Sequence, residues 1–217
     1  MRAWRVAGGS RPEVRSIFDG LAAKMQAGGA RGTNMFDLDR FLEECRGALK
    51  ETHPEGAIRD ILTRTLAEPR DVERAFGVPR EAGINPLYHS PELTVFNFVW
   101  APGMSIWPHE HRMWAVIGLY GGREDNVFYR RKPGGIEEAG GRRLDAQDTV
   151  ILGKDIIHSV TNPLAEFTGA IHVYGGDFFN TARVEWDAET REERAFDPER
   201  TKQLFKDANE RYLRSKE

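Results

Sequence analysis

The sequence LTVFNFVW at residues 93–100 sets the class of the fold. Its β-branched and aromatic residues are typical of a strand. Similar short runs continue toward the C-terminus, separated by glycine pairs and other turn residues: WAVIGLY (114–120), NVFYRR (126–131), DTVILG (148–153), FTGAIHVY (167–174) and RVEW (183–186). Strands this close together leave no room for crossover helices, so we expect an antiparallel sandwich or barrel.

The residues before this β region have a helical pattern. Apolar residues recur at helical spacing between residues 36 and 49, and again after Pro54 and after Pro69. Asp197 followed by Pro198 predicts a last helix that runs to about Arg214. We therefore expect a mainly β fold with an N-terminal helical layer and a C-terminal helix. The expected segments are a flexible extension (1–34), the helical layer (35–85), the barrel (86–188) and the C-terminal helix (189–217).

The composition narrows the class of protein. The chain has 217 residues, 40% of them hydrophobic, and a net charge of −3, with no stripe of Lys and Arg. We expect one core and neither a nucleic-acid nor a membrane partner. Cys45 is the only cysteine, which excludes an internal disulfide framework and favours a reducing, cytoplasmic compartment. No apolar run approaches the ~20 residues of a membrane helix. A homo-oligomer is left open.

The segment PHEHRM at residues 108–113 places two histidines one residue apart. In an extended strand His109 and His111 share a face, and if they face the interior so does Ile117, whereas Val116 faces the helical layer. Imidazoles in an apolar interior need partners for their polar atoms, and a metal ion is the most economical one. From this pair alone, hydrogen-bonded histidines without a metal remain the alternative.

The wider spacing adds to this pair. Gly103 precedes His109 by six positions, a glycine stands at Gly121, and His158 is separated from Asn162 by three residues. This pattern resembles the two sequence motifs of the cupins. The resemblance implies a double-stranded β-helix, which is a jelly-roll barrel.

The resemblance to cupins implies that His109, His111 and His158 are metal ligands. The glutamate that usually completes the cupin site falls on Ala115 or Val116. Three neutral imidazoles leave the full +2 charge on the metal and three positions open, which favours an anionic chelating substrate. A three-histidine iron site resembles the thiol dioxygenases, of which cysteine dioxygenase is the best-known member, and this implies Fe(II) as the cofactor.

The sequence AIHVY at residues 170–174 supports the same branch. His172 and Tyr174 are two residues apart on an expected strand and share a face. By resemblance to cysteine dioxygenases they lie beside the iron as catalytic residues. His172 orients the Tyr174 hydroxyl, which we expect to donate a hydrogen bond to substrate or oxygen. The alternative is a core tyrosine bonded to an imidazole. The serine that the family has two residues before the histidine is Ala170 here.

The substrate motif departs from the family. Ser90 stands where cysteine dioxygenases have the arginine of a Tyr-x-Arg segment, which holds the substrate carboxylate. Either another arginine replaces it, with Arg112, Arg123 and Arg130 as candidates, or the substrate has no carboxylate there, as in an amine-terminated thiol.

These features together predict a non-haem Fe(II)-dependent cupin dioxygenase that oxidises a small thiol to a sulfinate with O2. One alternative is a cupin oxygenase acting on a non-thiol chelating substrate such as a β-diketone. Another is a non-oxidative metal-binding cupin, either an isomerase or a ligand-binding module, and imidazole ligands suit Zn or Ni as well as Fe. No glycine-rich dinucleotide motif or P-loop is visible, so the expected partners are a small-molecule substrate and O2.

Overall fold

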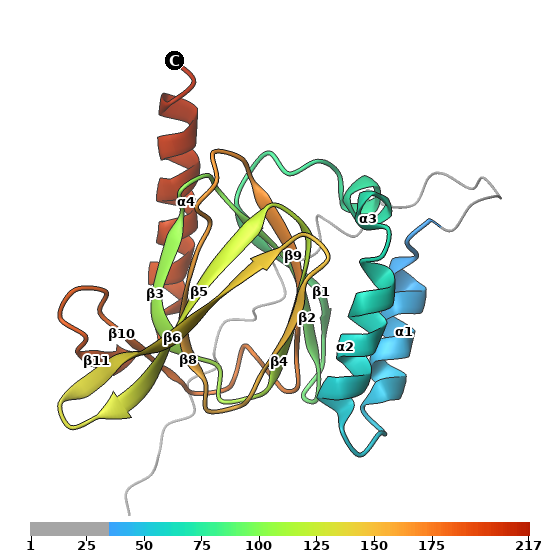
Figure 1. The fold of residues 1–217 in the computed structure, drawn as a ribbon, viewed down its shortest axis with the longest axis horizontal. Coiled ribbons are helices and arrows are strands. Elements are labelled where there is room, and N and C mark those ends of the chain that lie inside the picture. The colour runs from blue at the N-terminus through green and yellow to red at the C-terminus, as the bar shows by residue number, and fades with distance from the viewer. Residues whose placement is uncertain (1–34) are drawn as a thin grey trace, which may run out of the picture. The chain divides into compact units, whose positions relative to one another are not determined.

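The structure, a computed structural model, describes residues 35–217, and the extension expected over residues 1–34 lies outside the described residues. Within 35–217, three helices come first, strands follow, and one long helix comes last (Figure 1). The strands form two antiparallel sheets. The expected mainly β fold with helices at both ends is confirmed.

The helices begin where the sequence supplies starting residues. They are α1 (Leu38–Ala48), α2 (Pro54–Thr65), α3 (Pro69–Phe76) and α4 (Pro198–Arg214). The Asp37 side chain caps α1 by accepting from the Arg40 amide, and the Asp197 side chain caps α4 by accepting from the Glu199 amide. Proline opens the other two helices as well as α4, because its missing N–H costs nothing in the first turn. Of these helices in residues 35–217, none is both long and apolar enough to cross a bilayer.

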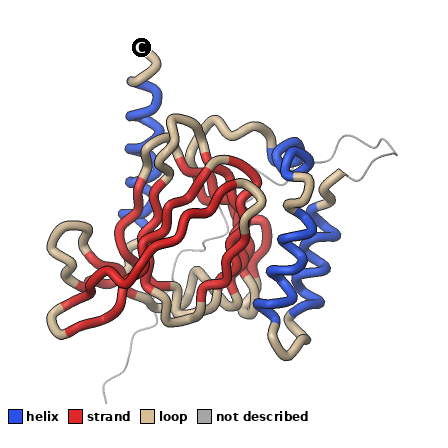
Figure 2. Tube along the Cα trace, in the orientation of Figure 1, coloured by secondary structure: helices blue, strands red, loops and turns tan. Residues whose placement is uncertain are grey.

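The two sheets face each other as layers (Figure 2). One has the order β1 (Gly83–His89), β2 (Thr94–Trp100), β9 (Thr168–Tyr174), β4 (Ala115–Gly121) and β7 (Thr149–Leu152). The other has the order β11 (Glu193–Ala195), β10 (Val184–Trp186), β3 (Ser105–Glu110), β8 (Ile157–Thr161), β5 (Arg123–Lys132) and β6 (Gly135–Asp145). β1 begins before residue 86, where the barrel was expected to start, and β11 lies in the segment expected for the C-terminal helix.

Strand β4 shows how the two apolar clusters are separated. Ile117 belongs to the cluster between the sheets, whereas Val116 packs in a second cluster with Leu62 and Leu66 of the helical layer. This alternation confirms the facing directions expected from the sequence. Gly118 lets α2 approach the sheet, since a Cβ atom there would lie 2.5 Å from Leu66 Cδ1.

The segment that carries the first two histidines is not one strand, so that expectation was wrong. β3 ends at Glu110, β4 begins at Ala115 in the other sheet, and Arg112 between them has φ of 60°. This left-handed backbone turns the chain from one sheet to the other. His109 therefore lies near the end of a strand and His111 in the connection, and both are still buried.

Candidate metal centre

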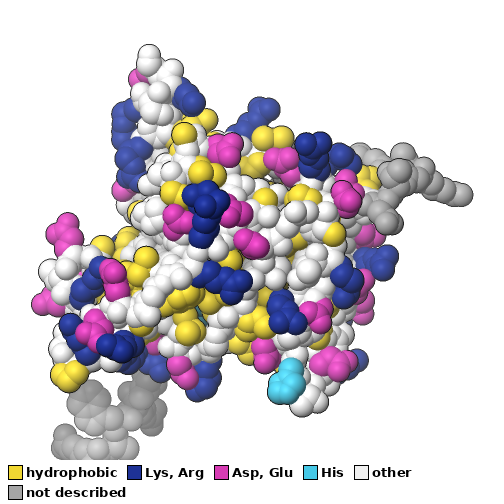
Figure 3. Space-filling model, in the orientation of Figure 1, with side chains coloured by type: hydrophobic (Ala, Val, Ile, Leu, Met, Phe, Trp, Pro, Cys, Tyr) yellow, Lys and Arg dark blue, Asp and Glu magenta, His cyan; other side chains and the backbone are white. Residues whose placement is uncertain are grey.

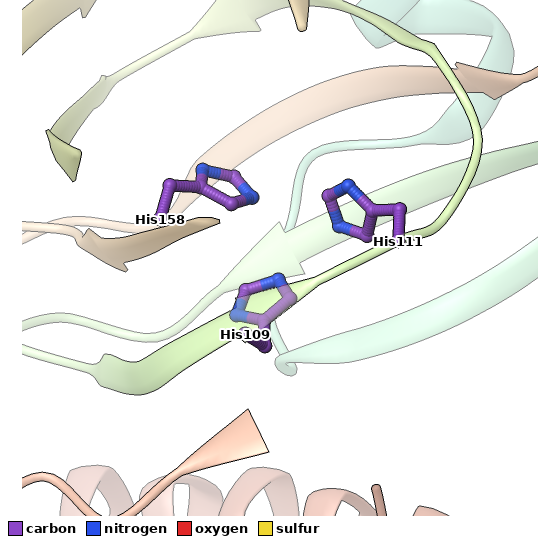
Figure 4. A group of neighbouring side chains, drawn as sticks. All are labelled: His109, His111 and His158. Carbon is purple, nitrogen blue, oxygen red and sulfur yellow. The ribbon is translucent and has the colours of Figure 1, made fainter. Parts of the chain in front are cut away.

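Three histidines from separate parts of the barrel converge in its interior. His109 pairs directly with His158 across β3 and β8, and His111 comes from the connection to β4. The exposed fraction is 9% for His109, 1% for His158 and 4% for His111. One ring nitrogen of each lies within 4.8 Å of the others, and Figure 4 shows the three imidazoles arranged around a common space. The structure thus brings together the three ligands expected from the sequence.

Hydrogen bonds on the far side of two rings decide which nitrogen faces this space. His158 Nδ1 lies 2.8 Å from Asn126 Oδ1, and His109 Nδ1 lies 3.0 Å from the Trp107 carbonyl oxygen. Both oxygens can only accept, so each Nδ1 carries the proton and each Nε2 keeps a lone pair. His158 Nε2 is buried and has no hydrogen-bond partner among the described residues. A metal ion would satisfy this nitrogen, so the residues present fit a metal.

The protonation state of the cluster also suits a metal. Burial lowers the pKa of His109 to about 4, and it lowers the pKa values of His111 and His158 well below their usual range. At neutral pH all three imidazoles are therefore neutral and can bind a cation without first losing a proton. The donor set of three imidazoles suits Fe, Zn, Cu and Ni alike.

His172 and Tyr174 from β9 lie beside the three histidines. The Tyr174 ring centroid is 4.9 Å from that of His111, and the Tyr174 hydroxyl oxygen is 3.0 Å from His172 Nδ1. Burial raises the pKa of the Tyr174 hydroxyl, so it is a neutral phenol. The other ring nitrogen of His172, Nε2, lies 3.5 Å from Glu124 Oε1. The expected pair is thus in place next to the cluster, with a carboxyl group behind it.

One small cavity of about 40 Å³ is lined by the three clustered histidines together with His172 and Tyr174. The rest of its wall is largely apolar and includes Phe98, Trp100 and Phe178. Two larger hollows, of about 750 Å³ beside α1 and α2 and about 460 Å³ beside α4, are open to solvent. We place the candidate site in the small cavity, because of these three hollows it is the one lined by several buried ionisable groups.

The cavity also contains an arginine that sequence reasoning missed. Arg183 is 7% exposed, and its guanidinium carbon lies 4.0 Å from the Phe178 ring centroid and 3.9 Å from that of Phe196. Its Nη1 donates to the Phe178 carbonyl oxygen at 2.6 Å, while its Nε is buried without a partner among residues 35–217. Burial lowers the pKa of Arg183 to about 10, so it is a cation at neutral pH. No motif marks this position, since one arginine before a strand has no periodicity.

The three arginines suggested from the sequence lie elsewhere. None is among the residues that line the cavity. Arg112 pairs with Glu110, Arg123 pairs with Asp145 at 3.1 Å, and Arg130 pairs with Glu137 at 2.6 Å. Ser90, at the position of the family's arginine, instead closes the turn between β1 and β2 by accepting from the Leu93 amide. On the face shown in Figure 3, positive and negative side chains are interspersed.

Comparison with known proteins finds solved structures that are similar to part of this chain. No protein-family model matches the sequence. Among solved structures, an RmlC-like cupin family protein with a double-stranded β-helix fold from Methanocaldococcus jannaschii is 9% identical, with a TM-score of 0.40 over 47% of this chain and 86% of that one. A cupin 2 conserved barrel domain protein from Salinispora arenicola is 24% identical, with a TM-score of 0.36 over 43% and 75%. Oxalate decarboxylase from Bacillus subtilis is 18% identical, with a TM-score of 0.34 over 41% and 22%.

Proposed function

We propose that the protein is a non-haem Fe(II)-dependent dioxygenase of the cytoplasm that uses O2 to oxidise a small anionic thiol to a sulfinate. One observation carries this proposal: Arg183, whose buried Nε has no partner among the described residues, lines the same 40 Å³ cavity as the three imidazoles and Tyr174. A cavity with a metal-binding end and a cationic end fits a substrate with two donor groups.

The metal-binding end is supported by the neutral imidazoles of His109, His111 and His158. Fe(II) held by them would supply the positive charge that favours a thiolate and the redox chemistry that adds dioxygen to sulfur. The reaction R–SH + O2 → R–SO2H takes all its electrons from sulfur. It therefore needs no nicotinamide or flavin, in keeping with the absence of their sequence motifs.

The cationic end is supported by Arg183. Its Nε has no partner within residues 35–217, and a donor buried without a partner is costly, so a carboxylate there would form a charge-assisted hydrogen bond. This arginine supplies the anion-binding group that Ser90 lacks. An amine-terminated thiol would instead bring a second cation next to the guanidinium, which disfavours it.

Tyr174 and His172 line the same cavity, and in this proposal the Tyr174 hydroxyl is the polar group that touches the substrate. The apolar rings of Phe98, Trp100 and Phe178 exclude water around it. A polar interaction in such surroundings is stronger than in water, so small displacements of the hydroxyl would change the rate.

The test is anaerobic purification with metal analysis, followed by oxygen uptake and product analysis with cysteine, 3-mercaptopropionate, cysteamine and a β-diketone. We expect about one iron per chain and one sulfinate formed per O2 consumed, with a carboxylate-bearing thiol preferred over cysteamine. The His109→Ala variant should lose both iron and uptake. Uptake with the β-diketone alone would favour a non-thiol oxygenase. Bound metal without any uptake would favour a non-oxidative cupin, and absence of any metal would overturn the proposal.

A further inference from the structure

Glu124 is a buried ionisable residue that the proposed function does not use. Its side chain is 0% exposed, and it stands near the start of β5 in one sheet. Its two polar neighbours, Trp100 of β2 and His172 of β9, belong to the opposite sheet. A carboxyl group is rarely fully buried unless its hydrogen bonds are made. Its position across the interior from both partners therefore calls for an explanation.

Among residues 35–217, the polar contacts of the Glu124 carboxyl group are made by one of its two oxygens. Trp100 Nε1 donates to Oε1 at 2.7 Å, and the same Oε1 lies 3.5 Å from His172 Nε2. An indole N–H can only donate, so Oε1 has to accept. Oε2 is buried and has no partner among the described residues. The oxygen that lies nearest to His172 Nε2 is therefore an acceptor.

The ring of His172 is held so that its two nitrogens have different neighbours. Phe98 stacks on it with 4.2 Å between ring centroids and 24° between ring planes. In this orientation Nε2 faces Glu124, and Nδ1 lies 3.0 Å from the Tyr174 hydroxyl. Ala170, the preceding residue on the same face of β9, has only a methyl group and cannot bond to the ring. Within the described part of the chain, Glu124 is therefore the hydrogen-bonding neighbour of His172 Nε2.

We propose that Glu124 is a positioning residue that keeps a proton of the His172 imidazole on Nε2 and leaves Nδ1 unprotonated. Nε2–H donates to Glu124, which leaves a lone pair on Nδ1, and the Tyr174 hydroxyl donates to that lone pair. The phenol oxygen then turns its own lone pairs toward the cavity. This direction is the reverse of the one implied by resemblance to cysteine dioxygenases, in which the tyrosine donates to the substrate or oxygen. Tyr174 would thus favour a ligand that brings a hydrogen-bond donor, such as the ammonium group of a thiol that also carries a carboxylate.

The first test needs no metal and no substrate. Long-range ¹H–¹⁵N NMR spectra of the metal-free, full-length protein distinguish a protonated ring nitrogen from one with a lone pair. The His172 signals are assigned by their loss in the His172→Gln variant. We expect a protonated Nε2 and an unprotonated Nδ1. A proton on Nδ1 in the unmodified protein, alone or together with one on Nε2, would overturn the proposal.

Three variants separate the hydrogen bond from general packing. Glu124→Gln should keep the His172 tautomer, because Trp100 still selects the amide oxygen as its acceptor. Glu124→Met has a similar volume but no such acceptor, and should move the His172 proton to Nδ1 or mix the two tautomers. Trp100→Phe removes the other buried hydrogen bond of Glu124 and should keep the tautomer while lowering the melting temperature. If Glu124→Met kept the unmodified spectrum, Glu124 would not set the tautomer.

A kinetic test rests on the proposed function. With the preferred thiol, Glu124→Met should lower kcat about tenfold at unchanged iron content, and Glu124→Gln should stay within about threefold of the unmodified enzyme. In the Tyr174→Phe background, Glu124→Met should have no further effect, because the two residues act through one hydrogen-bond chain. Additive losses would contradict the proposal. If no thiol is oxidised at all, the proposed function fails while the NMR result stands.

Discussion

Asn126 Oδ1 lies 2.8 Å from His158 Nδ1, and this hydrogen bond decides which nitrogen of His158 faces the metal space. Replacing Asn126 with Ala frees Nδ1 and lets the ring rotate, so we expect metal affinity to fall about 10–100-fold. The measurement is a competition titration with a chelator.

Asn97→Ala is the matched control for this prediction. Asn97 is buried as well, and its Oδ1 accepts a hydrogen bond of 2.8 Å from the Tyr120 hydroxyl. This pair is not part of the metal cluster. It should lower stability without changing metal affinity. Equal affinities in the two variants would mean that Asn126 does not orient His158.

Arg183→Gln should impair carboxylate-bearing thiols more than cysteamine. Loss of one charge-assisted hydrogen bond, about 1.5–3 kcal/mol, corresponds to a fall of about 10–150-fold in kcat/KM for a carboxylate substrate. The control is Arg130→Gln, which removes an exposed arginine paired with Glu137 and should leave both substrates unchanged. A parallel loss for both thiols would show that Arg183 maintains the cavity rather than binding the anion.

The metal-free protein should lose stability as the pH falls from 7 toward 4. His109, His111 and His158 have lowered pKa values in the folded state, so the unfolded chain binds more protons below its own histidine pKa of about 6.5. Each histidine contributes a slope of up to about 1.4 kcal/mol per pH unit, and the stability is fully present only above that pKa. Urea unfolding at several pH values measures the slope. The His109→Gln variant should unfold with a shallower pH dependence, and an unchanged slope would contradict this origin.

Cys45 should not react with a thiol reagent in the folded protein. The side chain is 0% exposed, and burial, with a smaller contribution from the neighbouring Glu44 carboxylate, raises its pKa to about 12. Little thiolate is therefore present at pH 8, and the reagent cannot reach it. We expect about one thiol per chain to react with a chromogenic disulfide after unfolding and almost none before. Rapid reaction of the native protein would show that the helical layer opens.

Gly118→Ala should destabilise the contact between α2 and the sheet. The added methyl group would meet Leu66 Cδ1 at 2.5 Å, and overpacking of this kind costs about 1–3 kcal/mol. Gly121→Ala, on the same strand, has no atom within 4 Å of its added Cβ and should be neutral or stabilising by up to about 1 kcal/mol. Chemical denaturation of both variants measures the difference, and equal stability would mean that Leu66 moves aside freely.

The parts of the structure that the sequence predicts are those with periodicity. Alternation along β4 correctly predicted that Val116 and Ile117 face opposite sides of the sheet. Val116 faces the helices and Ile117 faces the opposite sheet. The spacing of the two motifs predicted that His109, His111 and His158 lie close together, as they do in the structure. The turn at Arg112 was missed because this left-handed residue is neither glycine nor asparagine, which are the usual markers.

Arg183 and Glu124 could not be predicted in the same way. Each is a single charged residue in a stretch that also has exposed charges, and each owes its place to contacts across the barrel. Glu124 and Asn126 are two residues apart on the inward face of β5, and both are buried between less buried neighbours. This period of two is the pattern that could have pointed to Glu124. The pattern is informative only once the inward face of β5 is known, and that face depends on the pairing register of β5 with β8.

The bond between Arg183 Nη1 and the Phe178 carbonyl oxygen links two parts of the cavity wall. Phe178 and Arg183 both line the cavity and belong to one short segment, so we expect a displacement of one to displace the other. Widening the cavity by moving Phe178 would also draw the guanidinium away from a bound anion. Escape of a bound anion and loss of its electrostatic partner would then be a single event, and the residence time of a ligand would depend on how often this segment swings outward.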